Sequence, residues 1–181
     1  MGCGKSSVGR RLSQLLCCPF MDLDQVIEER EGRTIPEIFS RDGEPEFRRI
    51  ELEALKHVVG GRPSLVLALG GGAVMTAECA EIVHSDTLCI YLKASVETLM
   101  EHLSGQTDNR PLLSQKHSLN EISTRHCEES EGQRGNLELE TRIKELMTLR
   151  SDTYEKTAHI VIDTDGKSIE AVASEIISKL A

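Results

Sequence analysis

The chain has 181 residues, enough for one α/β domain with a sizeable hydrophobic core. Its formal net charge is −9, which disfavours a protein that binds nucleic acid by general phosphate neutralisation, because such proteins need a basic surface. We find no apolar run long enough to span a membrane and no basic-then-apolar signal peptide, so we expect a cytoplasmic protein.

The first predicted element is a helix from Lys5 to about Leu16, in which Val8, Leu12 and Leu15 recur at helical spacing. Short strands are predicted at 19–24, 64–69, 86–92 and 158–164. Helices are predicted at 34–41 and 45–59, and a closing amphipathic helix is predicted through Ile169, Val172, Ile176 and Leu180. Strands that alternate with helices indicate a parallel sheet covered by helices on both faces, with ligands at the carboxyl ends of the strands.

The opening stretch MGCGKSS matches the second half of the phosphate-loop pattern G-x-x-x-x-G-K-[ST]. In such a loop the backbone N–H groups converge on nucleotide phosphates, and Gly2 and Gly4 allow backbone conformations that a Cβ would obstruct. Lys5 would then reach the β and γ phosphates, and the Ser6 hydroxyl would ligate magnesium. The alternative is an ordinary glycine-rich helix start, capped by Ser6 or Ser7.

An acidic motif ends the first predicted strand, and a basic motif lies on a helix after it. MDLD at 21–24 offers the carboxylates of Asp22 and Asp24 on one side of a strand end, unless they only cap the next helix. FRRIE at 47–51 places Arg48 on a helix, although Arg48 or Arg49 could simply pair with neighbouring glutamates on a solvated face.

Three further motifs contain the glycine and arginine candidates. LGGGAV at 69–74 gives a backbone that a ligand can approach closely, or only a tight turn. RPLL contains Arg110, and R-x-x-x-Y-x-x-x-A contains Arg150, which could also be a surface residue beside Asp152. The sequence is polar and aperiodic over about 105–136, which indicates a mobile lid or a disordered insert.

The six cysteines and six histidines do not favour a metal centre or disulfides. They show no C-x-x-C pair and no H-x-x-x-H spacing, and Cys17 and Cys18 are adjacent. We therefore expect reduced cysteines and no zinc site.

Taken together and in this order, the motifs resemble those of shikimate kinase, a small P-loop kinase of aromatic amino-acid biosynthesis. The resemblance runs from Gly2 to the C-terminus. It implies a P-loop NTPase-type fold in a single domain over 1–181, with substrate-binding helices at about 33–60 and a mobile lid. It also implies transfer of a phosphoryl group from ATP to the 3-hydroxyl of shikimate, with Mg²⁺, in a monomer.

The resemblance assigns roles to particular residues. The catalytic residues would be Lys5, Asp24 and Arg110. Nucleotide binding is assigned to Gly2, Cys3, Gly4, Lys5, Ser6, Ser7 and Arg110, and magnesium binding to Ser6 and, through water, Asp22. Shikimate binding is assigned to Asp24, Arg48, Gly70, Gly71, Gly72 and Arg150.

Two departures from the family pattern lead to further expectations. The leading glycine of the loop and the strand before it would stand ahead of Met1, so we expect the central position of the sheet to be empty and Met1 to be an internal methionine of a longer natural protein. Arg110 and Arg150 are 40 residues apart, which indicates an enlarged lid.

The rival interpretations are another small-molecule kinase, of the gluconate or nucleoside monophosphate type, and a non-catalytic binding protein on the same fold. A nucleotide acceptor would need a base pocket, whereas DLD with FRRIE suits a carboxylated polyol better. The truncated phosphate loop favours a non-catalytic protein. The joint presence of six site residues counts against it: Lys5, Ser6, Asp24, Arg48, Arg110 and Arg150.

Overall fold

A computed structural model of the chain describes residues 3–61, 64–103 and 131–180. Helices and strands alternate along it, as predicted. The elements in chain order are α1 (Lys5–Leu15), β1 (Phe20–Asp22), α2 (Leu23–Glu31), α3 (Ile35–Gly61), β2 (Val66–Ala68), η1 (Ala73–Met75), α4 (Ala77–Asp86), β3 (Ile90–Lys93), α5 (Val96–Leu103), α7 (Glu131–Thr157), β4 (Ile160–Asp163) and α8 (Ile169–Leu180).

All four strands lie within or beside the predicted segments, and their pairing is parallel, as predicted. Strand β1 pairs with β2 and strand β3 with β4, in registers that place Phe20 opposite Val66 and Ile90 opposite Ile160. Within the described part of the chain the two pairs are separate two-stranded sheets. The sequence predicted an empty position at the centre of the sheet, and this separation agrees with it.

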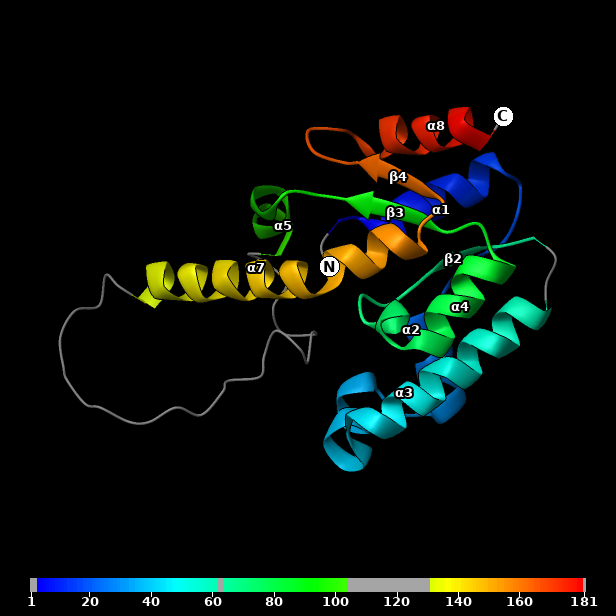
Figure 1. Cartoon of the computed structure of the whole chain (residues 1–181), viewed down its shortest axis with the longest axis horizontal. Helices are drawn as coiled ribbons and strands as arrows, with labels where there is room; N and C mark the ends of the chain where they lie inside the picture. Colours follow the sequence, from blue (N-terminus) through cyan, green and yellow to red (C-terminus); the bar gives the residue numbers. More distant parts are fainter. Residues whose placement is uncertain (1–2, 62–63, 104–130, 181) are drawn as a thin grey trace.

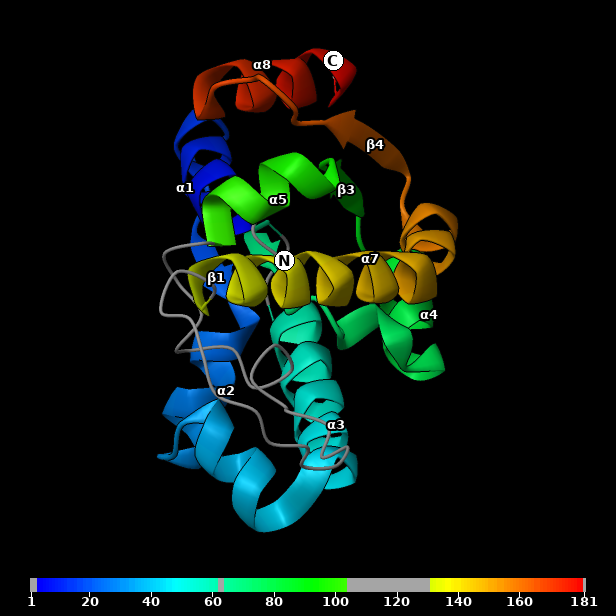
Figure 2. The same ribbon diagram turned by 90° about the vertical axis from the view of Figure 1, so that its left-hand side faces the viewer.

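The helices form layers around the two strand pairs. Helices α1 and α8 lie beside the β3–β4 pair, and α2, α3 and α4 lie towards the other end of the molecule (Figure 1). Turned by 90°, the molecule shows α7 crossing between the α8 end and the α3 end (Figure 2). Buried side chains of α2, α3 and α4 form one core cluster, and those of α1, β4 and α8 form a second.

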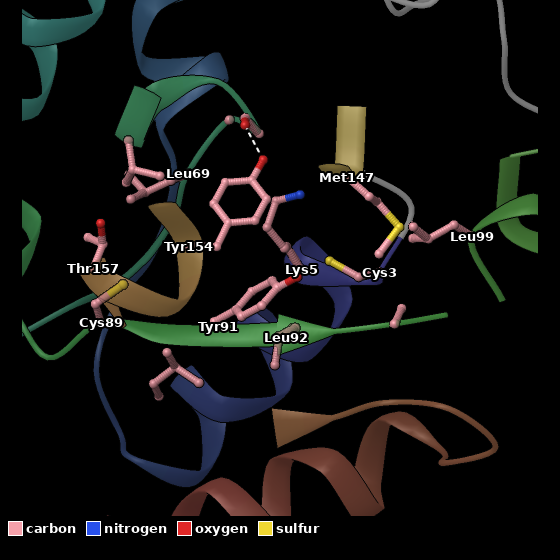
Figure 3. A pocket seen from close by; sticks show the side chains of 15 residues that line it. Cys3, Lys5, Leu69, Cys89, Tyr91, Leu92, Leu99, Met147, Tyr154 and Thr157 are labelled. Atoms are coloured by element: carbon pink, nitrogen blue, oxygen red, sulfur yellow. Dashed lines mark hydrogen bonds between the residues drawn. The ribbon is translucent and has the colours of Figure 1, made fainter. Parts of the chain in front are cut away.

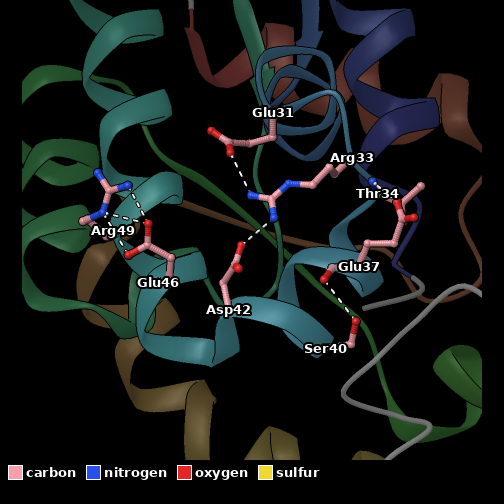
Figure 4. A network of polar contacts seen from close by, with 8 residues as sticks. All are labelled: Glu31, Arg33, Thr34, Glu37, Ser40, Asp42, Glu46 and Arg49. Atoms are coloured by element: carbon pink, nitrogen blue, oxygen red, sulfur yellow. Dashed lines mark hydrogen bonds and ion pairs between the residues drawn. The ribbon is translucent and has the colours of Figure 1, made fainter.

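The corner between α2 and α3 is fixed by polar contacts. Arg33 donates to Glu31 at 3.2 Å and to Asp42 at 2.7 Å, so it joins the end of α2 to the first part of α3 (Figure 4). Glu37 accepts from both the backbone N–H and the hydroxyl of Thr34, a capping arrangement at the start of α3.

Helix α3 consists of two helical stretches, as the sequence predicted. The kink between them lies at Gly43, whose φ of 82° is a left-handed conformation that favours glycine. The second stretch contains FRRIE. Arg48 therefore lies on the helical stretch that follows the kink.

Several predicted boundaries were wrong. The strand predicted at 86–92 begins only at Ile90, because Asp86 is the last residue of α4. Strand β1 ends at Asp22, and Asp24 lies in the first turn of α2 rather than at a strand end. The polar segment was expected to run to about residue 136, but α7 begins at Glu131. The rest of the predicted lid, with Arg110, lies outside the described residues, and so does Gly2.

No described helix is both long and apolar enough to cross a membrane.

Candidate functional site

The predicted phosphate loop ends in a left-handed glycine at the start of α1. Gly4 precedes the helix with φ 75° and ψ 20°, in the left-handed region, and its carbonyl accepts from the Val8 N–H at 2.9 Å. Lys5 follows as the first helical residue, so its ammonium group lies where the helix dipole is positive. Cys3 packs against the side chains of α5 and α7, and Ser7 is exposed on the first turn.

The predicted magnesium pair, Ser6 and Asp22, is brought together. The Ser6 hydroxyl donates to Asp22 Oδ2 at 2.8 Å, although the two residues are 16 positions apart. Asp22 Oδ1 accepts from the Asp24 N–H at 3.2 Å, so Asp22 also caps α2, as the alternative interpretation proposed. One hydroxyl and one carboxylate are the kind of oxygen ligands that Mg²⁺ shares with water and phosphate. The described residues hold no group of three or more His, Cys, Asp or Glu that could bind a metal by themselves.

Asp24 lies against the first glycine of the GGG stretch. A Cβ on Gly70 would be 2.9 Å from Asp24 Oδ1 and 3.6 Å from Glu51 Oε1. The carboxylate of Asp24 can approach the backbone this closely because Gly70 has no side chain.

Arg48 is held by two carboxylates of its own helix. Its Nη1 donates to Glu51 Oε2 at 2.7 Å and its Nη2 to Glu44 Oε1 at 3.0 Å. Glu51 is 1% exposed and Glu44 56%, so Glu51 provides the rigid contact. A Cβ on Gly72 would be 2.6 Å from Arg48 Nη2, which shows that the guanidinium lies directly on this glycine.

The Arg48–Glu51 pair is electrostatically unusual. Burial raises the pKa of Glu51, and the bond to Arg48 opposes this rise only in part. Burial also lowers the pKa of Arg48, but its bonds to Glu51 and Glu44 outweigh this effect and the net shift is upward. The arginine therefore stays charged, while Glu51 takes up a proton at a higher pH than an ordinary glutamate does.

Arg49 provides an internal contrast to Arg48. It pairs with Glu46 and Glu53 on the outer face of α3, and its side chain is 54% exposed, against 18% for Arg48 (Figure 4). Pairing with glutamates of the same helix, the alternative that the sequence left open, therefore holds for both arginines, but only Arg49 does so on a solvated face.

Arg150 reaches the middle glycine from α7. It is 9% exposed, and its Nη1 donates to the Gly71 carbonyl at 3.1 Å. The Tyr154 hydroxyl, one helical turn later, donates to the same carbonyl (Figure 3). Burial raises the pKa of Tyr154, so its phenol remains a donor at neutral pH. Arg150 is therefore not a surface residue.

A cavity of about 120 Å³ lies between these elements. It is lined by Cys3, Lys5, Gly70, Gly71 and Tyr154, among others, and Lys5 extends into it (Figure 3). The start of α1 and the GGG stretch therefore line the same cavity.

The structure therefore brings most of the predicted site residues together, but it also adds two that sequence reasoning did not select. Glu51 anchors Arg48, and Tyr154 shares the Gly71 carbonyl with Arg150. The sequence signals were present, since Glu51 belongs to FRRIE and Tyr154 to R-x-x-x-Y.

Comparison with known proteins decides the family. The family model described as shikimate kinase matches residues 1–181. The chain belongs to the shikimate kinase family. A shikimate kinase of Thermus thermophilus is 38% identical over 180 residues, which cover 99% of this chain and 85% of the relative. A shikimate kinase of Dictyoglomus turgidum is 35% identical over 182 residues, covering 99% and 92%.

Solved structures of shikimate kinases have the same fold. The shikimate kinase of Acinetobacter baumannii, solved in complex with shikimate, superposes with a TM-score of 0.83 at 32% identity and covers 99% of this chain and 88% of that one. The shikimate kinase of Bacteroides thetaiotaomicron gives a TM-score of 0.78 at 25% identity, with 99% and 93% covered. The predicted fold class is confirmed.

Proposed function

We propose that this protein transfers the γ-phosphoryl group of ATP to the 3-hydroxyl of shikimate. One observation supports this most strongly: three polar side chains meet three consecutive glycines. Asp24 lies on Gly70, Arg150 donates to Gly71, and Arg48 lies on Gly72. These side chains come from three different helices, α2, α7 and α3, so spacing along a single helix does not explain why they meet the same glycine stretch.

The two arginines suit the carboxylate of shikimate. A guanidinium has five N–H donors, and Glu51 and Glu44 each accept from one nitrogen of Arg48. Further N–H groups of Arg48 and Arg150 can therefore donate to a planar carboxylate, and charged hydrogen bonds of this kind contribute about 1.5 to 3 kcal/mol each. Glu51 keeps the Arg48 guanidinium in place before the substrate arrives.

Asp24 is the proposed acceptor of the proton of the reacting hydroxyl. The hydroxyl oxygen forms a bond to the γ-phosphorus while the bond from that phosphorus to the β,γ-bridging oxygen breaks, and ADP leaves with the electron pair. The hydroxyl proton passes to the Asp24 carboxylate. Such a positioned base typically contributes about 100-fold to 10,000-fold to the rate.

The start of α1 is the proposed phosphate site. ATP supplies the transferable phosphoryl group, and Lys5 with the backbone N–H groups of the first helical turn would hold its phosphates. Ser6 and Asp22 would hold Mg²⁺, directly and through water. Positioning and charge neutralisation are the main contributions that a protein makes to this chemistry.

We further propose a monomer that acts in the cytoplasm on small molecules and does not bind nucleic acid. The net charge of −9 is in keeping with this, and so are the five cysteines in the described part of the chain, which are all free thiols. Cys127 lies outside that part.

The test is an ADP-release assay with a panel of acceptors: shikimate, gluconate and a nucleoside monophosphate. We expect release that depends on shikimate and a fall of at least 100-fold in kcat for Asp24→Asn. Glu29→Gln, the same carboxylate-to-amide change at an exposed position of the helix that contains Asp24, is the matched control. Release with another acceptor would move the assignment to a related kinase, and ATP binding without any acceptor-dependent release would indicate a binding protein.

A further inference from the structure

Two donors from one helix hold the carbonyl of Gly71. Arg150 Nη1 donates to it at 3.1 Å, and the Tyr154 hydroxyl donates to the same oxygen (Figure 3). The two donors are four residues apart on α7, so they leave the helix on one face. A carbonyl oxygen has two lone pairs, so both bonds can form at once. The GGG stretch is therefore tied to α7 at its middle residue.

The peptide unit between Gly71 and Gly72 has little stiffness of its own. Glycine on both sides lets such a unit turn over, because no Cβ restricts the backbone dihedral angles. The described part of the chain contains no cis peptide bond, so the Gly72 N–H points in the direction opposite to the Gly71 carbonyl. The carbonyl faces α7, and the N–H faces away from it. A reversed unit would present the N–H to Arg150, whose guanidinium has no acceptor.

The Gly72 N–H is a buried donor that no described residue pairs. Gly72 is buried, and its own carbonyl accepts from the Met75 N–H at 3.0 Å, but its N–H has no acceptor within the part of the chain that the structure describes. Buried backbone N–H groups are rarely left unpaired in proteins. Since the Arg48 guanidinium lies on the same glycine, we expect the acceptor to be an oxygen of the ligand that Arg48 holds.

Tyr154 is the donor whose bond to Gly71 does not compete with the substrate. Arg150 is an expected partner of the shikimate carboxylate, and a guanidinium binds a carboxylate more strongly than it binds a neutral carbonyl. A phenol has a single O–H to donate, and here Gly71 accepts it. The ring of Tyr154 packs against the core cluster of α2, α3 and α4, and the centroid of the Tyr91 ring lies 5.2 Å from its own. These contacts fix the direction of the hydroxyl.

We propose that Tyr154 is a positioning residue for the substrate: its hydroxyl holds the Gly71–Gly72 peptide so that the Gly72 N–H donates to an oxygen of bound shikimate. The inference rests on the proposed function. Arg150 supplies a second bond to the Gly71 carbonyl before shikimate binds, and Tyr154 keeps the peptide in the same orientation when the carboxylate draws Arg150 towards itself. Shikimate then meets a donor that needs no reorientation, which favours binding.

The test compares the wild type with Tyr154→Phe and Tyr91→Phe, each labelled with ¹⁵N-glycine. Both variants remove one hydroxyl from residues that line the same cavity, but the Tyr91 hydroxyl makes no hydrogen bond to any described residue, so Tyr91→Phe is the matched control. The Gly72 resonance is identified by its absence from a Gly72→Ala spectrum. The readouts are the shift of the Gly72 amide proton at saturating shikimate and the Kd values of shikimate and ATP from calorimetry.

In the wild type and in Tyr91→Phe, saturating shikimate should move the Gly72 amide proton downfield, as a new hydrogen bond does. Tyr154→Phe should lose at least half of this shift. It should also bind shikimate about 2-fold to 12-fold more weakly, the value of one neutral hydrogen bond, with the Kd of ATP unchanged. Because the shift is read at saturation, a general weakening of binding does not imitate its loss. A full shift in Tyr154→Phe, or an equal loss in Tyr91→Phe, would overturn the proposal.

The same experiment separates this inference from the proposed function. A wild-type protein that binds no shikimate contradicts the proposed function and the inference with it, whereas shikimate binding that Tyr154→Phe leaves unchanged contradicts the inference alone. If Tyr154→Phe does not fold, a crystal structure of the wild type with shikimate decides. A Gly72 nitrogen within about 3.2 Å of a shikimate oxygen, with Tyr154 still donating to Gly71, supports the proposal, and a Gly72 N–H that faces no substrate oxygen overturns it.

Discussion

Replacing Gly72 by alanine tests how Arg48 is positioned. The new Cβ would lie 2.6 Å from Arg48 Nη2 and 2.8 Å from Nη1, closer than such contacts occur in proteins. The backbone at Gly72 has φ −103° and ψ −10°, which alanine adopts without strain. The substitution therefore acts on the guanidinium and not on the local backbone.

The guanidinium cannot move away without cost. Its bond to Glu51 is 2.7 Å long, and Glu51 is 1% exposed, so displacement would leave a buried carboxylate without its partner. If Arg48 instead loses one bond to the substrate carboxylate, the loss is about 1.5 to 3 kcal/mol, or roughly 10-fold to 150-fold in affinity for shikimate. We expect this loss as a rise in KM for shikimate, with kcat changed much less.

The assay is steady-state ADP release at saturating ATP, together with thermal unfolding to show that the variant is folded. Gly60→Ala is the control, because a Cβ there meets no atom within 4 Å and Gly60 lies on the same helix as Arg48. A folded Gly72→Ala protein with unchanged KM for shikimate would refute the role given to Arg48.

Three other predictions concern neighbouring groups. Burial raises the pKa of Glu51, so KM for shikimate should rise as pH falls, because a protonated Glu51 no longer anchors Arg48. The folded protein also binds this proton more tightly than the unfolded one, so the free energy of unfolding should fall as pH rises above about 4.5. The Glu51→Gln variant should show neither trend. Tyr154→Phe removes one of two donors to a carbonyl of the GGG stretch and should raise KM for shikimate several-fold without changing KM for ATP; a change confined to thermal stability would contradict this. Ser6→Ala removes the 2.8 Å bond to Asp22 and should increase the Mg²⁺ concentration needed for half-maximal activity, as a magnesium titration would reveal.

Much of the site could be predicted from sequence because each motif follows a strand or begins a helix. Parallel strands bring their carboxyl ends to one edge, so Asp22 at the end of β1 and Gly70 just after β2 lie at the same edge. The same reasoning placed Lys5 at the start of α1. These inferences needed only the order of the elements and their periodicity.

Other features depend on tertiary packing, which periodicity does not report. FRRIE and its surroundings contain several glutamates at helical spacing from the two arginines, and only packing against Gly70 and Gly72 distinguishes Glu51 from Glu53. The end of β1 at Asp22 was also missed, because the capping bond to the Asp24 N–H competes with continued extended structure.

The most direct test of the proposed function is the stoichiometry of the reaction. The protein is incubated with ATP, Mg²⁺ and shikimate, ADP is quantified, and ³¹P NMR measures any new phosphate ester on shikimate. We predict one shikimate 3-phosphate for each ADP formed. ADP that appears with inorganic phosphate and without the ester, or no ADP from a protein shown to bind both ligands, would contradict the account.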